Sequence, residues 1–425
     1  MKKNIISVFV VCTIIYNTSN AQNSIQRAEN MAATIMKTYP DSMVVMKYIN
    51  HLMQDNLLTG GEKDMATANK NRPANWNYEI GVVLMGFERL WQVTGNEKYY
   101  QYLKHIIDHF IADDGTIKTY NQEEYNSDNI PPGRQLITMF KKEQSKKYEV
   151  AITTLRNQIS LQPRNKAGGF WHKLKYPSQM WLDGLYMIEP FYAGYANTFN
   201  SAADFDDIIN QFVWMEKYSI DKKTGLLYHG WDESKLQPWA NKKNGTSPEF
   251  WSRSMGWYIM ALVDVLDYVP KDHPRKKELI SILNRLSTAL IKTQDKSSGV
   301  WWQITNKPGK EGNYLESSAS AMFVYGMAKG IRMKYLPVSF LLNVKKGYDG
   351  LVKQFVTTDT AEVVHYTKAV SGAGLGGYPY RDGSYDYYIK EPKRDDDLKA
   401  IGPFMQACIE MDLLNKKNAI KKNVR

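Results

Sequence analysis

The sequence predicts an all-α fold, an (α/α)6 barrel made of six helical hairpins. Six mostly apolar segments each begin with a polar or aromatic residue, and they recur at intervals of roughly 50–85 residues. Between them lie amphipathic segments that carry charge on one face at i, i+3 and i+4 spacing. Because an apolar helix can be buried only against neighbours, this alternation predicts a closed double ring of inner and outer helices.

The inner helices are expected at the apolar segments, and all of them begin at the same end of such a ring. Residues at their N-termini therefore converge on one pocket, whose floor of positive helix-dipole ends suits an anionic ligand. The six segments begin, in chain order, at Trp76, Asp128, Trp181, Trp251, Glu316 and Gly402.

The outer helices are expected over the amphipathic segments. A sixth outer helix does not follow the last apolar segment, so residues 26–39 are expected to supply it. The other five segments begin at Lys98, Lys146, Asp204, Arg275 and Phe340.

The N-terminus has the layout of a secretory signal peptide over residues 1–21. A basic start is followed by an apolar stretch over 5–15 and by small residues before Gln22. The stretch is shorter than the roughly 20 apolar residues that cross a bilayer, so we expect export, to the periplasm, and no membrane span. No linker or low-complexity break follows, so residues 22–425 are expected to form one barrel domain.

Composition bears on the class of partner. The formal net charge of +11 favours acidic partners through long-range attraction. No nucleic-acid motif is present and the lysines are dispersed outside the C-terminal tail, so nucleic acid is not the expected partner. The 11 Trp and 28 Tyr offer flat faces on which sugar rings stack, which favours a small acidic oligosaccharide. Alternatively, the positive charge forms a solvated surface that is unrelated to any substrate. The sequence does not indicate the oligomeric state.

Two aspartates are the candidate catalytic acids. Asp183 lies in the first turn of the apolar segment WLDGLYM, where desolvation raises the pKa of a carboxyl toward the range that a general acid needs. Asp128 lies at the start of another inner helix, and two neighbouring carboxyls separate their pKa values. The alternative for each is a helix-capping acid, which is favourable at any helix start.

Histidine, arginine and tryptophan side chains supply candidate binding groups. His172 and His229 lie in loops near aromatic residues, where an imidazole can bind hydroxyls or carry protons, although such loop histidines are often only exposed. Arg253 lies between Trp251 and Trp257, which suits a bidentate carboxylate clamp with flat surfaces beside it, or else a stack made for packing. The histidines are scattered and no HExxH or CxxC motif is present, so neither a metal nor another cofactor is expected.

A glycine-rich segment spans residues 372–388. It lacks the strand and helix that flank a dinucleotide-binding loop, so phosphate binding is not expected there. We expect a loop near the mouth of the barrel that brings Tyr378, Tyr380 and Arg381 close to the pocket.

Several of these motifs occur together in one known family. The segments PSQMWLDGLYM, LLYHGWDES, FWSRSMGWY, LESSASAMFVYGMAKGI and GAGLGGYPYRDGSYDYYI follow one another over nearly the whole chain. In this order they resemble glycoside hydrolase family 105, the unsaturated rhamnogalacturonyl hydrolases. The resemblance implies a catalytic (α/α)6 barrel over residues 22–425 and a metal-independent reaction on the unsaturated uronic acid that polysaccharide lyases leave at the non-reducing end.

The resemblance also implies a mechanism and roles for residues. The family hydrates the C4=C5 enol ether rather than attacking the glycosidic carbon, with Asp183 as the acid and base. Asp128 matches the second acid, which holds and polarises the first. The residues that match those lining the subsite for the unsaturated sugar are Tyr78, His172, Trp181, His229, Trp251, Arg253 and Trp257.

Three other functions remain open at this level. An unsaturated glucuronyl hydrolase acting on glycosaminoglycan, ulvan or arabinogalactan fragments would share the barrel and the chemistry. A non-catalytic glycan-binding protein would share only the barrel. A conventional inverting glycosidase would need two acids well separated around a water molecule and would cleave saturated oligosaccharides.

Overall fold

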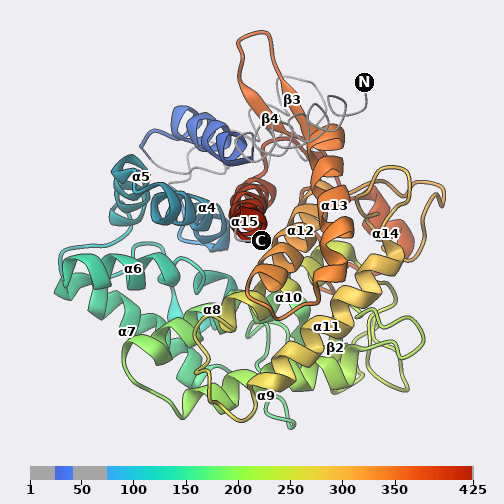
Figure 1. The fold of residues 1–425 in the computed structure, drawn as a ribbon. Helices are drawn as coiled ribbons and strands as arrows, with labels where there is room; N and C mark the ends of the chain where they lie inside the picture. The colour runs from blue at the N-terminus through green and yellow to red at the C-terminus, as the bar shows by residue number, and fades with distance from the viewer. Residues whose placement is uncertain (1–23, 42–73, 424–425) are drawn as a thin grey trace, which may run out of the picture.

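A computed structural model describes residues 24–41 and 74–423 and contains the double ring of helices (Figure 1). Within these residues, each inner helix packs against the next and the last returns to the first, so the inner ring is closed. The residues of α10 are buried along its whole length, as expected for a helix surrounded by others. The predicted (α/α)6 barrel is therefore confirmed. The inner helices are α4 (Tyr78–Thr94), α6 (Gly133–Glu143), α8 (Leu182–Thr198), α10 (Ser252–Val265), α12 (Ser317–Arg332) and α15 (Leu398–Asn423).

The outer helices each pack on the inner helix that precedes them. A helix over residues 24–38, blue in Figure 1, fills the remaining place in the outer ring. Its Glu29 accepts a hydrogen bond of 3.1 Å from Tyr99 on one side, and its Arg27 donates one of 3.5 Å to Tyr348 on the other. The segment predicted to close the ring does so. The other outer helices are α5 (Glu97–Asp108), α7 (Lys146–Leu161), α9 (Asp204–Ser219), α11 (Lys276–Thr293) and α13 (Leu341–Phe355).

Two of the predicted helix starts precede the helix itself. Trp76 lies before α4, and its indole donates a 2.8 Å hydrogen bond to the carbonyl oxygen of Asn129. Asp128 lies in a separate 3-10 turn, η2 (Ser127–Asn129), and α6 begins only after two prolines, at Gly133. The hydrogen bond between Trp76 and Asn129 connects the segments that precede two neighbouring inner helices, α4 and α6.

Gly402 is not a helix start, because α15 begins at Leu398 and continues through Gly402. A Cβ atom on Gly402 would lie 2.4 Å from the carbonyl oxygen of Val82 in α4. Glycine therefore permits close approach of two inner helices at this position, which the sequence pattern did not distinguish from a helix start.

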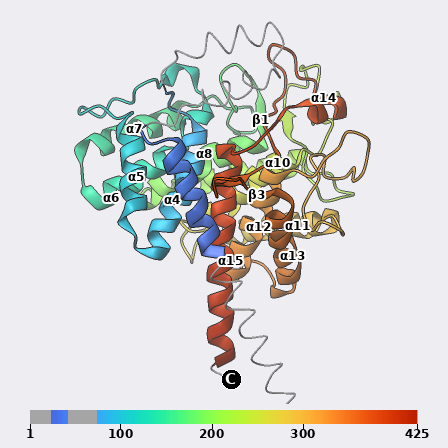
Figure 2. The same ribbon diagram turned by 90° about the horizontal axis from the view of Figure 1, so that it is seen from above.

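Short strand pairs connect the hairpins, and the sequence did not predict them. The first pair places Trp181 opposite Gly230, and so holds His229 beside the start of α8. Figure 2 shows β1 and α14 at one end of the barrel and the C-terminal end of α15 at the other. The antiparallel pairs are β1 (Gln179–Trp181) with β2 (Gly230–Asp232), β3 (Val356–Thr358) with β4 (Val364–Tyr366), and β5 (Ala369–Val370) with β6 (Lys393–Arg394). The remaining short helices are η1 (Gln122–Glu124), η3 (Val338–Phe340) and α14 (Tyr385–Lys390).

Two N-terminal predictions concern the membrane and export. None of the helices in the described ranges is both long enough and apolar enough to cross a membrane. The predicted signal peptide, residues 1–21, lies outside the described residues.

Candidate active site

A cavity of about 380 Å³ lies at the end of the barrel where the inner helices begin. The first turns of α4, α8, α10 and α15 contribute Tyr78, Asp183, Arg253 and Lys399 to its wall. Eight of the nine residues proposed from the sequence line this cavity, and the ninth, His229, contacts Asp183. The lining consists of Tyr78, Asp128, His172, Lys173, Tyr176, Trp181, Asp183, Met187, Trp251, Arg253, Trp257, Ser371, Gly372, Ala373, Arg381, Tyr387, Glu391, Arg394 and Lys399.

Asp183 and His229 are held together by the first strand pair. The backbone N–H of Leu182, at the start of α8, donates a 3.0 Å hydrogen bond to the carbonyl oxygen of His229. The side chains then meet, with Nε2 of His229 3.2 Å from Oδ2 of Asp183. Both residues are buried, so the carboxyl has an imidazole on one side and the cavity on the other.

The imidazole of His229 is fixed from three sides. Its ring centroid lies 5.3 Å from that of Trp181 and 4.7 Å from that of Trp251. Its Nδ1 lies 2.7 Å from the hydroxyl of Tyr388, which belongs to α14. His229 is therefore a rigid neighbour of Asp183 rather than an exposed loop histidine.

Asp128 has cationic and imidazole partners. Lys173 donates a hydrogen bond to Oδ2 of Asp128, and Nε2 of His172 lies 3.8 Å from its Oδ1. Burial raises the pKa of Asp128, but Lys173 and His172 outweigh burial and hold that pKa below its ordinary value. Burial lowers the pKa of His172 to about 4, although Asp128 opposes this shift. At neutral pH Asp128 is therefore a carboxylate and His172 is neutral.

Asp128 and Asp183 both line the cavity, but no hydrogen bond connects their side chains in the described residues. Within the described part of the chain, the side-chain partners of Asp128 are Lys173 and His172, not Asp183. His172 interacts electrostatically with both carboxyls. The family resemblance implies that Asp128 holds Asp183 in place. In this structure the two carboxyls are not joined by a direct hydrogen bond, and His172 is the residue that interacts with both.

Aromatic rings form much of the remaining wall. Trp181 stacks against both His172 and Tyr176, with its ring centroid 4.5 and 4.7 Å from theirs and interplanar angles of 22° and 27°. Trp257 packs edge-on against Tyr78, with the centroids 6.2 Å apart. These planar surfaces are of the kind on which a pyranose ring stacks.

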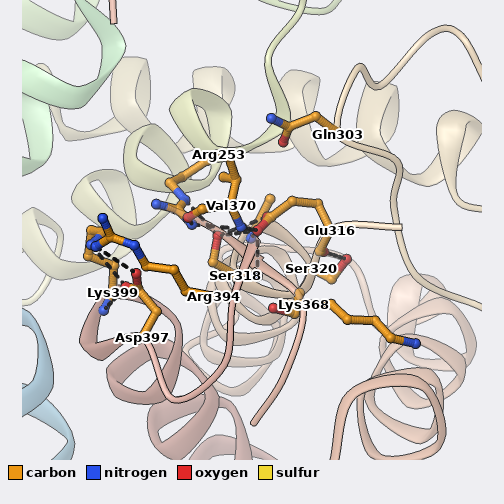
Figure 3. Close-up of polar contacts among 12 residues, drawn as sticks. Arg253, Gln303, Glu316, Ser318, Ser320, Lys368, Val370, Arg394, Asp397 and Lys399 are labelled. Carbon is orange, nitrogen blue, oxygen red and sulfur yellow. Dashed lines mark hydrogen bonds and ion pairs between the residues drawn. The ribbon is translucent and has the colours of Figure 1, made fainter. Parts of the chain in front are cut away.

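Arg253 is engaged inside the protein more than its sequence context suggested (Figure 3). Its Nε donates a 2.7 Å hydrogen bond to Ser318, and its Nη2 donates to the carbonyl oxygen of Val370 and lies 3.5 Å from Oε1 of Glu316. A buried guanidinium needs such partners to offset its lost hydration. Nη1 makes no hydrogen bond or ion pair with the described residues, so one guanidinium nitrogen is left for an anion where a fork of two nitrogens was expected.

Cationic residues that the sequence analysis passed over also line the cavity. Lys399 lies 2.7 Å from Glu79 and 3.0 Å from Asp397, and Arg394 lies 3.9 Å from Asp397 (Figure 3). Lys173 could have been found from its position next to His172. Arg394, in β6, and Lys399, at the start of α15, belong to no recognisable motif, and closure of the ring brings the start of α15 to the cavity.

The glycine-rich segment lines the cavity with Gly372, Ala373, Arg381 and Tyr387, but only one of the three side chains expected there is among them. Arg381 lines the cavity and donates a 2.7 Å hydrogen bond to the hydroxyl of Tyr176. Tyr378 is fully exposed, and Tyr380 uses its hydroxyl to accept a hydrogen bond from the backbone of Trp239. Neither tyrosine lines the cavity.

Comparison with known proteins gives a consistent assignment. Residues 45–414 match the model of Glycosyl Hydrolase Family 88. The fold is similar to that of a family 105 glycoside hydrolase from C. acetobutylicum ATCC 824, with a TM-score of 0.79, 42% identity, and coverage of 87% of this chain and 100% of that one. Protein Atu3128 of Agrobacterium fabrum is 38% identical over 53% of this chain and 98% of its own length. The unsaturated rhamnogalacturonyl hydrolase YesR of Bacillus subtilis is 27% identical over 58% of this chain and 68% of its own.

Proposed function

Since the chain belongs to the glycoside hydrolases of families 88 and 105, we propose that it removes the unsaturated uronic acid from the non-reducing end of the pectin (rhamnogalacturonan) oligosaccharides that polysaccharide lyases produce. The observation that carries this proposal is the buried carboxyl of Asp183, which lines the cavity and contacts His229. The similarity to a rhamnogalacturonyl hydrolase supports the choice of substrate.

The proposed reaction uses Asp183 twice. As the family resemblance implies, the protonated carboxyl first gives its proton to C4 of the enol ether. A water molecule then adds at C5 and returns a proton to the carboxylate, which restores Asp183. The resulting hemiketal opens, and the bond between C1 and the aglycone oxygen breaks with release of the next sugar. One water molecule is consumed, and no group of the enzyme is changed.

Asp128 is proposed to act as a carboxylate throughout. Lys173 and His172 keep its pKa low, so it remains ionised at neutral pH. A fixed negative charge in the cavity stabilises positive charge that develops on the sugar ring when C4 is protonated.

The charge of the cavity supports an acidic substrate. Lys173, Arg381, Arg394 and Lys399 all line it, and Arg253 lies among them. A uronate carboxylate entering this cavity is attracted by several nearby cations. These contacts favour binding of the acidic sugar and leave the identity of the next sugar to the outer part of the site.

The proposal is tested by product analysis on a panel of lyase digests. Digests of rhamnogalacturonan, glycosaminoglycans, ulvan and arabinogalactan are incubated with the enzyme and the products are identified by mass spectrometry. We expect release of the unsaturated uronate from rhamnogalacturonan fragments above all others. Preference for another digest would show that the substrate is a different glycan and that the reaction is the one proposed. Binding without turnover on every digest would favour a glycan-binding protein.

A further inference from the structure

The imidazole of His229 bridges the carboxyl of Asp183 and a phenol from a distant part of the chain. The hydroxyl of Tyr388 lies 2.7 Å from Nδ1, and Oδ2 of Asp183 lies 3.2 Å from Nε2. His229 and Tyr388 are both fully buried. Nε2 of His229 and Oδ2 of Asp183 approach closely without forming an aligned hydrogen bond, and neither atom has a hydrogen-bond partner among the described residues.

The hydrogen atoms of the imidazole and the phenol determine which ring nitrogen of His229 is protonated. A neutral imidazole carries one N–H, on either nitrogen. If Nδ1 carried it, the hydroxyl of Tyr388 would have to accept, and the phenolic hydrogen would be left without an acceptor in the described part of the structure. A buried donor without a partner is costly. The phenol therefore donates to Nδ1, and the imidazole hydrogen lies on Nε2 and faces Asp183.

We propose that Tyr388 is a positioning residue that, through the tautomer of His229, determines which oxygen of Asp183 carries the catalytic proton. A hydrogen on Nε2 has the buried Oδ2 within 3.2 Å as its available acceptor, so Oδ1 is left to carry the proton toward the cavity. The inference rests on the proposed function of Asp183. It adds that the same tautomer serves both halves of the reaction, because Oδ2 accepts from Nε2–H whether Oδ1 is protonated or ionised.

The surroundings of Tyr388 hold its ring in place. Its ring stacks on that of Trp251, with centroids 5.7 Å apart and an interplanar angle of 23°. Gln303 accepts a 3.2 Å hydrogen bond from the indole of Trp251 and donates one of 3.2 Å to the backbone carbonyl of Tyr388. Besides Asp183, the ionisable groups that act on this phenol are Tyr387, Glu249 and Arg381.

The helix that carries Tyr388 offers a matched control. Tyr385 lies one turn earlier on α14, and its hydroxyl donates a 2.8 Å hydrogen bond to the carbonyl oxygen of Glu311, away from His229. Tyr385→Phe thus removes the same atom and one hydrogen bond from the same helix without touching the bridge. Any loss that is common to both variants reflects the stability of α14.

The experiment compares Tyr388→Phe with Tyr385→Phe in turnover and in the tautomer of His229. On the unsaturated uronyl-rhamnose disaccharide, we expect Tyr388→Phe to lower kcat roughly tenfold or more while KM stays within about twofold. We expect Tyr385→Phe to stay within about twofold of the wild type. In protein labelled with 15N-histidine, with His229→Gln used for assignment, the imidazole of His229 should carry its hydrogen on Nε2 and lose this preference in Tyr388→Phe alone.

Two results would overturn the inference. One is a wild-type His229 that carries its hydrogen on Nδ1, and the other is a Tyr388→Phe variant with the kcat of Tyr385→Phe and an unchanged imidazole spectrum. The spectrum is recorded without substrate. A wild-type enzyme that is inactive on unsaturated uronides would therefore refute the proposed function while the role of Tyr388 in fixing the tautomer is still measured.

Discussion

Lys173 donates a hydrogen bond to the carboxylate of Asp128, and both side chains line the cavity. This contact, together with His172, outweighs the effect of burial and lowers the pKa of Asp128. The cavity therefore contains a carboxylate whose ionisation depends on its neighbours, Lys173 first among them.

Replacing Lys173 by Met should move the acidic limb of the pH–activity profile to higher pH. Without the ammonium group the pKa of Asp128 rises, so at a given acidic pH a smaller fraction of the enzyme has the carboxylate. We expect a displacement of roughly one pH unit in kcat/KM. Lys146→Met, on the exposed face of α7, serves as the control. If the acidic limb of Lys173→Met coincided with that of the control, the pKa of Asp128 would not depend on Lys173 as proposed.

Removing His172 should make the protein more resistant to mild acid. The pKa of His172 falls from its ordinary 6.5 to about 4 in the folded state, so the unfolded chain binds a proton in this interval that the folded chain does not. Stability consequently decreases as the pH falls from about 6.5 to about 4, by up to about 3 kcal/mol. Urea unfolding at several pH values should show a smaller decrease for His172→Gln. The exposed His109→Gln should retain the wild-type slope, and equal slopes for all three proteins would contradict the assignment.

Arg253 and Glu316 should behave as a coupled buried pair. Arg253→Met leaves the carboxylate of Glu316 buried without its cation, which costs about 3–5 kcal/mol of unfolding free energy. In Arg253→Met/Glu316→Gln the uncompensated charge is gone, so part of that loss should be recovered. Urea unfolding of both single variants and the double variant measures the coupling. Strictly additive losses would show that the two side chains do not stabilise each other.

The chain is also proposed to be exported after cleavage of residues 1–21. A basic start, an apolar stretch and a small-residue site precede Gln22. On expression of residues 1–425 in a Gram-negative host, the N-terminal sequence of the periplasmic protein should begin at Gln22. Protein that retains Met1 and stays in the cytoplasm would refute the export proposal.

The sequence predicted the ring because the pattern of each hairpin is local. Trp181 and Asp183 are two residues apart at the start of α8, so a single motif places both at the cavity. Tyr388 contacts His229 across 159 residues, and no periodicity reports such a pairing. The partners of Arg253 were missed for the same reason, since Ser318 and Val370 come from other hairpins. Contacts that depend on ring closure became visible only in the structure.

Whether Asp183 hydrates a double bond or assists ordinary glycosidic cleavage is tested by following two signals in one reaction. The unsaturated galacturonyl-rhamnose disaccharide is mixed with enzyme while the ultraviolet absorbance of its conjugated double bond and the release of rhamnose are both recorded. We predict that the absorbance disappears at the rate at which rhamnose forms, and that Asp183→Asn loses both signals while keeping its fold and its affinity for the disaccharide. Rhamnose release that leaves the absorbance intact, or an Asp183→Asn variant that keeps a substantial part of the wild-type rate, would contradict the account.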